Sequence, residues 1–231
     1  MNRIEGLHHL AISTGDIKAQ IEFCTDVLGM ELVALYWMHG VPNTWHGFLR
    51  LNDESSIAFV QNPKIAALPR TIGVSHAGNS GGVSAPGTMQ HVALRVRGHD
   101  EIMAMRDRLR AKGVPVLGPL DHGMCESIYF AGPENLCLEL SWSREPIDAE
   151  AWIDPEVVAL AGITAEELAR YKRPAAFVDQ CGGVTQPGPD AAGPHMTGYP
   201  PGVYERLLAM TDAQISANIE NRPPVDVSAR A

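Results

Sequence analysis

The residues with the clearest chemical potential are two histidines and a glutamate at matched places in two similar stretches of the chain. His9 lies in the run LHHLAIS and His91 in the run QHVALRV, and an amphipathic helical pattern follows each. Glu139 lies within the apolar run NLCLELSW. Burying a lone carboxylate in such a strand costs several kcal/mol unless a cation or hydrogen bonds compensate. A bound metal ion would supply that compensation.

The alternation of side chains along a strand relates the two histidines. His9 lies on one face of its strand, whereas Leu10 and Ile12 point to the other. The strand that carries His91 divides in the same manner, into a smaller and more polar face and an aliphatic face suited to contact with a helix. We therefore expect both histidines to point into the same concavity. His8 competes with His9 for this role, but it shares its face with the aliphatic side chains.

An internal repeat sets the expected architecture. Residues 3–63 and 88–142 each show a strand, a helix and three further strands, and residues 64–87 form a connection rich in Gly, Ser and Pro. Ala58 and Glu139 occupy equivalent positions of the two repeats, within one residue. The pattern predicts an α+β fold in which paired βαβββ modules form a curled eight-stranded half-barrel with its helices outside.

The predicted domain covers residues 1–145, and residues 146–231 form a mostly helical C-terminal extension. Asp154-Pro155 and a capping-box pattern at Thr164 mark two helix starts. A stretch rich in Gly and Pro precedes a last amphipathic helix, predicted over 203–221. The extension is not expected to make a core of its own, so we expect it to narrow the entrance to the site.

Composition restricts the class of partner. Of the 231 residues, 45% are hydrophobic, which allows a substantial core. The net charge of −9 comes from 18 Lys and Arg against 27 Asp and Glu, without a basic cluster. This balance argues against nucleic acid or an anionic membrane surface as the partner and favours a small molecule.

Cysteine usage and the N-terminus indicate the compartment. The four cysteines show no paired spacing, which favours free thiols in a reducing compartment: Cys24, Cys125, Cys137 and Cys181. No apolar run approaches the roughly 20 residues of a spanning helix. The chain enters its first strand without a basic and apolar leader. We therefore expect a cytoplasmic protein.

Three stretches carry a family resemblance: LHHLAISTGDI with IEFCTDVLGMEL, then QHVALRV, then IYFAGPEN with LELSW. They resemble the vicinal-oxygen-chelate superfamily, which includes glyoxalase I, bleomycin-resistance proteins and type I extradiol ring-cleaving dioxygenases. In that superfamily the metal ligands come from the first and last strands of the two modules. The resemblance therefore implies that His9, His91 and Glu139 bind the metal, with Ala58 at the fourth position.

The resemblance also implies the metal and its neighbours. Because Ala58 cannot bind a metal, two histidines and a glutamate remain, a set that suits non-haem Fe(II), with Mn, Zn, Ni or Co as alternatives. The family's tyrosine stands ten residues before the glutamate ligand, as Tyr129 does, and a family acid–base histidine precedes the second histidine ligand, as His76 does. A third family histidine falls on Leu120 here, and His122 stands two places further on.

The function implied by the resemblance is an Fe(II)-dependent extradiol-type dioxygenase that acts on a catechol-like or related vicinal-oxygen aromatic substrate with dioxygen. Tyr129 and His122 would bind substrate oxygens, and His76 would transfer protons. One alternative is a glyoxalase-like metal-dependent isomerase, epimerase or lyase. Another is a non-catalytic small-molecule-binding protein of the resistance type. Members of the superfamily often pair, so a homodimer is expected.

Overall fold

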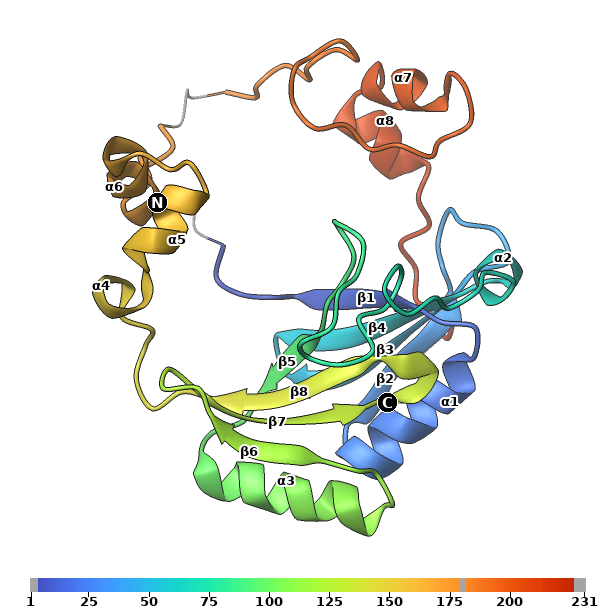
Figure 1. Ribbon diagram of the computed structural model, residues 1–231. Helices are drawn as coiled ribbons and strands as arrows, with labels where there is room; N and C mark the ends of the chain where they lie inside the picture. Colours follow the sequence, from blue (N-terminus) through green and yellow to red (C-terminus); the bar gives the residue numbers. More distant parts are fainter. Residues whose placement is uncertain (1–3, 179–181, 227–231) are drawn as a thin grey trace. The chain divides into compact units, whose positions relative to one another are not determined.

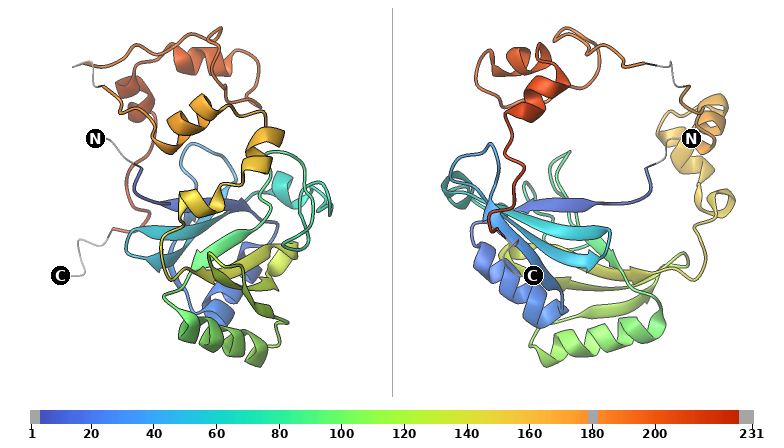
Figure 2. Two further views of the ribbon diagram at one scale, coloured as in Figure 1. Left: turned by 60° about the vertical axis from the view of Figure 1, so that its left-hand side comes forward. Right: turned by 180° about the vertical axis from the view of Figure 1, so that it is seen from behind.

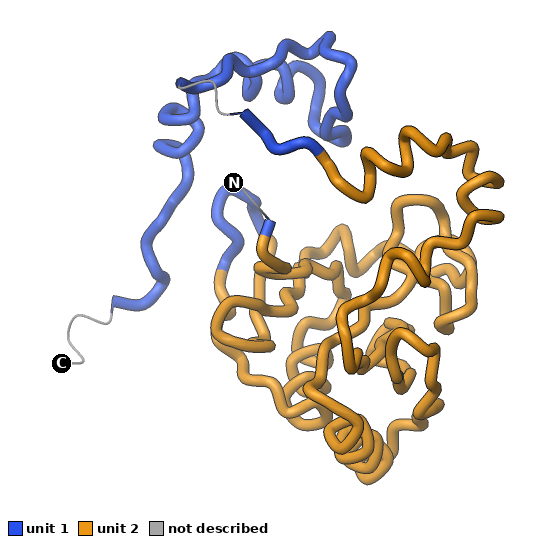
Figure 3. The backbone as a smooth tube through the Cα atoms, turned by 90° about the vertical axis from the view of Figure 1, so that its left-hand side faces the viewer, with its two compact units in different colours: residues 1–4, 37–43, 175–231 blue, residues 5–36, 44–174 orange. Residues whose placement is uncertain are grey.

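A computed structural model describes residues 4–178 and 182–226 of the chain. The chain divides into two compact units (Figure 3). The larger, called here the sheet unit, comprises Glu5–Tyr36 and Thr44–Pro174. The smaller, the extension unit, comprises Met1–Ile4, Trp37–Asn43 and Ala175–Ala231. All predicted site residues belong to the sheet unit.

The first module follows the order predicted from the repeat (Figure 1). Its elements are β1 (His9–Ser13), α1 (Ile17–Glu22), the π-helical η1 (Phe23–Leu28), β2 (Glu31–Trp37), β3 (Trp45–Asn52) and β4 (Ser55–Gln61). The strands form a sheet in the order β1-β4-β3-β2, with β1 parallel and β3 antiparallel to β4. The side chain of Asp16 caps α1 by accepting the N–H of Ala19 at 3.0 Å. Gly29, with φ of 80°, ends η1 in the left-handed region.

The second module repeats this topology. Its elements are β5 (Val92–Arg95), α3 (His99–Ala111), β6 (Leu117–Asp121), β7 (Glu126–Ala131), the 3₁₀ turn η2 (Pro133–Asn135) and β8 (Cys137–Trp142). Its strand order, β5-β8-β7-β6, matches that of the first sheet. The connection between the modules holds one short helix, α2 (Pro63–Ala66). The predicted α+β fold of paired βαβββ modules is confirmed, with the eight strands in two four-stranded sheets.

The aliphatic faces of both sheets share one hydrophobic core. Ile12 and Phe59 from the first module line the same small internal space as Leu94 and Leu138 from the second. Removing each such side chain from water stabilises the fold by about 1.5–3 kcal/mol. The two modules therefore depend on each other for their stability.

This packing decides where the remaining faces point. Helices α1 and α3 lie on the same side of the sheets (Figures 1 and 2), and Arg108 of α3 donates to the carbonyl of Val27 in η1 at 2.6 Å. Because side chains alternate along a strand, the faces that carry His9 and Glu139 turn away from the shared core. The expectation that His9 and His91 face one concavity therefore stays a prediction.

We call these surfaces the first and second outer faces. Strand register places five residues used below on the first outer face: His9, Ala11, His46, Phe48 and Ala58. The same criterion defines the second outer face: Ala93, Tyr129, Cys137, Glu139 and Ser141. His91 directly precedes β5 at the edge of this face, so it lies just outside the strand in which it was predicted.

Glu134, in the second module, forms side-chain hydrogen bonds with the first module. In η2 it has a φ of 58°, a left-handed conformation that costs a non-glycine residue roughly 1–2 kcal/mol. Its carboxylate accepts hydrogen bonds from Thr14 Oγ1 at 2.6 Å, from the N–H of Gly15 at 2.9 Å and from Gln20 Nε2 at 3.0 Å. Burial favours the neutral acid, but these hydrogen bonds outweigh it and hold the pKa of Glu134 below its usual range.

The C-terminal part contains short helices. The sheet unit includes α4 (Ala149–Trp152), α5 (Pro155–Leu160) and α6 (Ala165–Lys172), and the extension unit includes α7 (Val203–Leu208) and α8 (Asp212–Ala217). The predicted helix starts at Asp154 and Thr164 are confirmed. The single helix predicted over 203–221 is wrong, because Thr211 and Gln214 form a capping box that begins a new helix there.

The structure bears on two of the sequence predictions, the absence of a membrane-spanning helix and the presence of free thiols. None of the helices in the described ranges has the length and apolar character needed to cross a bilayer. Three of the cysteines are free thiols: Cys24, Cys125 and Cys137. Cys181 lies outside the described residues.

Candidate metal centre

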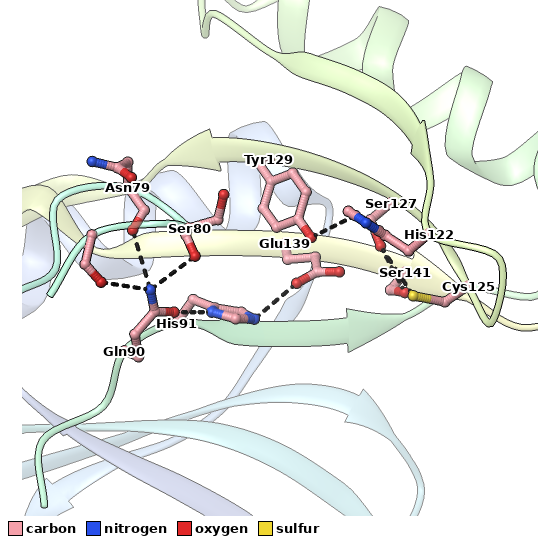
Figure 4. Close-up of polar contacts among 11 residues, drawn as sticks. Asn79, Ser80, Gln90, His91, His122, Cys125, Ser127, Tyr129, Glu139 and Ser141 are labelled. Atoms are coloured by element: carbon pink, nitrogen blue, oxygen red, sulfur yellow. Dashed lines mark hydrogen bonds and ion pairs between the residues drawn. The ribbon is translucent and has the colours of Figure 1, made fainter. Parts of the chain in front are cut away.

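The second outer face brings two predicted ligands into contact. Glu139 is central in its sheet, between Ala93 of β5 and Tyr129 of β7. Its Oε2 lies 3.0 Å from Nε2 of His91, with side-chain exposures of 6% for Glu139 and 34% for His91 (Figure 4). The buried carboxylate therefore has a partner that remains accessible from outside.

Gln90 sets the orientation of His91. Its side-chain nitrogen donates to the carbonyls of Ser80 at 2.9 Å and Gly82 at 3.0 Å. The amide oxygen consequently faces His91 and accepts the hydrogen of Nδ1, so that Nε2 points at Glu139 (Figure 4). Sequence reasoning missed Gln90, because its partners are backbone carbonyls of a loop whose path depends on the tertiary fold.

This geometry fits a divalent metal. With Nδ1 donating to Gln90, Nε2 of His91 is either protonated or free to share a cation with Glu139. Two donors about 2.1 Å from one ion, at right angles, lie about 3 Å apart, and the two atoms are 3.0 Å apart here. Within the described ranges, however, no three His, Cys, Asp or Glu side chains gather closely enough to hold an ion.

Tyr129 and His122 form a second pair beside the first. The Tyr129 hydroxyl lies 3.1 Å from Nε2 of His122, whose backbone N–H donates to the carbonyl of Cys125 at 2.8 Å. Burial, together with the charge of Glu139, raises the pKa of Tyr129 above its usual value. The hydroxyl therefore stays protonated at neutral pH and can hydrogen-bond a ligand next to Glu139.

His9 lies apart from these groups, on the first outer face. It is exposed, its Nδ1 lies 2.9 Å from Nδ1 of His8, and its ring centroid is 5.3 Å from that of Phe48 and 6.2 Å from that of His46. A single chain thus brings two of the three predicted ligands together and leaves the third apart. The ligand set itself stays a prediction.

The centre of the first outer face is crowded and apolar. Ala58 is fully buried there, and the rings of His46 and Phe48 lie 4.5 Å apart between their centroids. His46 is only 7% exposed, and its Nε2 is buried without a hydrogen-bond partner in the described part of the chain. Burial and the charge of nearby His9 lower the pKa of His46. This face offers rings for stacking where the second outer face offers a carboxylate.

His76 has contacts within its own loop. Its Nδ1 lies 2.8 Å from the hydroxyl of Ser75, and its backbone forms an isolated bridge with Ile72. These contacts order the connection between the modules. They do not join His76 to the groups around Glu139, so its predicted acid–base role stays a prediction.

The two four-stranded sheets of paired βαβββ modules are the fold of the vicinal-oxygen-chelate type. A family model described as the Glyoxalase/Bleomycin resistance protein/Dioxygenase superfamily matches residues 6–140. The chain belongs to this superfamily, which confirms the resemblance seen in the sequence. A comparison with curated proteins gave no match.

Three solved structures are similar to this chain, and the first of them, with a TM-score of 0.50, supports the fold. A glyoxalase/bleomycin resistance protein/dioxygenase domain from Frankia sp. EAN1pec is 13% identical, with a TM-score of 0.50 over 62% of this chain and 100% of that one. The antibiotic-binding protein TnmS3 from Streptomyces sp. CB03234 is 17% identical, with a TM-score of 0.45 over 62% and 99%. A fosfomycin resistance protein from Listeria monocytogenes, in complex with Mn(II) and sulfate, is 19% identical, with a TM-score of 0.40 over 60% and 93%.

Proposed function

We propose that this protein is a homodimeric, Fe(II)-dependent dioxygenase of the extradiol type, in which the partner's His9 completes a metal site begun by His91 and Glu139. The observation that carries the proposal is the 3.0 Å contact between Nε2 of His91 and Oε2 of Glu139. Both groups lie on a face turned away from the core, and His91, 34% exposed, is accessible there to a group from outside the chain.

A second copy is the simplest source of the missing ligand. Each chain turns His9 outward on one face and the His91–Glu139 pair outward on the other. A two-fold axis that sets the first outer face of one copy against the second outer face of the other creates two equivalent sites. Each site would then hold two imidazoles and one carboxylate, with the fourth corner left open by Ala58. Such a set suits Fe(II) with free positions for substrate and dioxygen.

The division of labour follows from the contacts. His91, Glu139 and the partner's His9 would hold the ion, which when bound supplies chelation of adjacent substrate oxygens and activation of dioxygen. The Tyr129 hydroxyl would hydrogen-bond one oxygen of a catechol, and His122 would hold that hydroxyl in position and exchange its proton. Both atoms of dioxygen enter the ring-opened product, so no further reductant is required.

The direct test uses protein purified and loaded with Fe(II) under anaerobic conditions. Added catechols should then trigger uptake of dioxygen, and Glu139→Gln should abolish both the uptake and most of the metal binding. Turnover without dioxygen, supported by Mn, Zn, Ni or Co, would favour an isomerase, epimerase or lyase. Failure of every catechol to consume dioxygen would refute the dioxygenase.

One observation favours a second candidate function, a small-molecule-binding protein without catalysis. The first outer face gathers the rings of His9, His46 and Phe48 around a small residue, an arrangement suited to stacking a planar ligand. In that case the protein purifies without stoichiometric metal. Glu139→Gln would then leave ligand affinity nearly unchanged, which separates this function from the dioxygenase.

A further inference from the structure

The side chain of Gln90 is held more firmly than its surface position requires. Its nitrogen reaches the carbonyls of Ser80 and Gly82, with that of Asn79 at 3.4 Å, while its oxygen meets Nδ1 of His91 (Figure 4). A glutamine amide cannot be reversed here, because its oxygen would then face these carbonyls. The loop therefore determines which end of the amide faces the imidazole.

The consequence is a fixed role for each ring nitrogen of His91. An amide oxygen can only accept, so Nδ1 of His91 carries a hydrogen, and Nε2 is the nitrogen presented to a cation next to Glu139. Groups that orient a ligating histidine in this way typically change metal affinity 10- to 100-fold when they are removed. Gln90 is thus placed to act on the metal without touching it.

The loop itself is tightly constrained at one position. A Cβ atom at Gly82 would come within 2.1 Å of the carbonyl oxygen of Ala77, so any side chain there forces the backbone to shift. At the neighbouring Gly81, a Cβ would lie 3.6 Å from the side chain of Asn79, an ordinary contact. Glycine at 82 therefore keeps one of the carbonyls that anchor Gln90 in place.

We propose that Gln90 is a positioning residue that couples the loop at 79–82 to the metal affinity of His91, an inference that rests on the metal site proposed above. Loop geometry fixes the Gln90 amide, the amide holds the hydrogen on Nδ1 of His91, and this orientation presents Nε2 to the ion. A change in the loop then alters metal binding although no loop atom touches the ion.

The test compares Gln90→Leu, Gly82→Ala and the matched control Gly81→Ala in the full-length protein. The affinity for Mn(II) is measured by titration, and the hydrogen on Nδ1 of His91 by ¹⁵N NMR of the metal-free protein. Gln90→Leu should weaken Mn(II) binding about 10- to 100-fold and reduce the fraction of His91 with a hydrogen on Nδ1. Gly82→Ala should move both readouts in the same direction by a smaller factor, and Gly81→Ala should leave both unchanged.

The two readouts separate failure of this inference from failure of the proposed function. Wild-type affinity and an unchanged hydrogen on Nδ1 of His91 in Gln90→Leu would overturn the role of Gln90 while leaving the metal site intact. Absence of Mn(II) binding in the wild-type protein would refute the metal site, and the coupling to metal affinity with it. Equal effects of Gly81→Ala and Gly82→Ala would overturn the proposed route through the loop.

Discussion

The two outer faces have the same strand order and come from equivalent halves of a repeat, yet they offer different chemistry. At the centre of the second face, the carboxylate of Glu139 lies 3.0 Å from an imidazole that Gln90 holds in place. At the equivalent centre of the first face stands Ala58, fully buried. A repeat can therefore keep its backbone register while placing a carboxylate at the centre of only one half.

The difference has a physical cause in side-chain size and charge. A glutamate in the middle of a sheet requires a cationic or hydrogen-bonding partner, so its surroundings must be polar and fixed. An alanine makes no such demand and leaves room for rings to converge. His9 consequently borders an aromatic cluster, with Phe48 5.3 Å away between centroids. In the proposed site, the first face would contribute aromatic rings that contact the ligand, and the second face would contribute the His91–Glu139 pair that binds the metal.

The largest expected effect is on oxygen uptake. It tests whether the first outer face of one chain and the second outer face of its partner form the site together. His9→Ala and His91→Ala should each reduce oxygen uptake more than about 100-fold, since both remove a proposed metal ligand. Co-expressed at equal levels, they should recover about a quarter of wild-type activity, because half of the dimers are mixed and each mixed dimer holds one intact site.

The control for this experiment pairs two changes on the same face. His91→Ala co-expressed with Glu139→Gln damages the second outer face of every chain, so activity should stay lost. If both combinations remain inactive while mixed dimers form, the ligands do not come from two chains and the assignment of the faces is wrong.

The next effect concerns the hydrogen bonds that hold the two halves together. Glu134→Ala removes three hydrogen bonds to a charged acceptor and should lower the free energy of unfolding by about 3 kcal/mol, measured by urea denaturation. Glu54→Gln, at an exposed turn, should leave the unfolding midpoint unchanged. An equal response in both variants would show that the Glu134 contacts contribute nothing to stability.

Glu134 also predicts a dependence of stability on pH. Its pKa is lower in the folded protein than in the unfolded chain, so its contribution is present above the unfolded value of about 4.3 and is lost as the pH falls through the folded value. The difference in unfolding free energy between wild type and Glu134→Ala should accordingly shrink below about pH 4. A difference that stayed constant with pH would contradict the ionised state assigned to this carboxylate.

A smaller effect separates ligand binding from metal binding on the second face. Tyr129→Phe removes the hydroxyl that His122 holds at 3.1 Å and should lower kcat about tenfold, the value of one good hydrogen bond. The affinity for Mn(II) should not change, because the hydroxyl is not a proposed ligand. Loss of metal in this variant would mean that Tyr129 belongs to the metal site itself.

The smallest effect probes the first face. His46→Phe replaces a buried imidazole whose Nε2 lacks a partner with a ring of similar size, and should raise the free energy of unfolding by about 1 kcal/mol. Phe48→Leu, on the same face, should lower stability by a similar amount through lost packing. A loss of stability in His46→Phe would show that the imidazole has a structural partner in the assembled protein.

Much of the fold could be predicted from local patterns. The strand and helix order of both modules, the cap at Asp16 and the equivalence of Ala58 with Glu139 follow from alternation, capping residues and the repeat. The break at Thr211 was missed although its capping box with Gln214 is a local signal. The role of Gln90 could not be predicted, since its partners are carbonyls brought close by the fold of a loop.

The sequence by itself determined the strand face on which each candidate side chain lies. Successive side chains of a strand point to opposite faces, so the position of a residue in its strand is sufficient. Only the tertiary structure decided which faces meet. The aliphatic faces of both sheets pack into one core, because that arrangement removes the most apolar surface from water. The His9 face and the Glu139 face are thereby turned away from this core, a result of packing over the whole sheet unit that no local pattern contains.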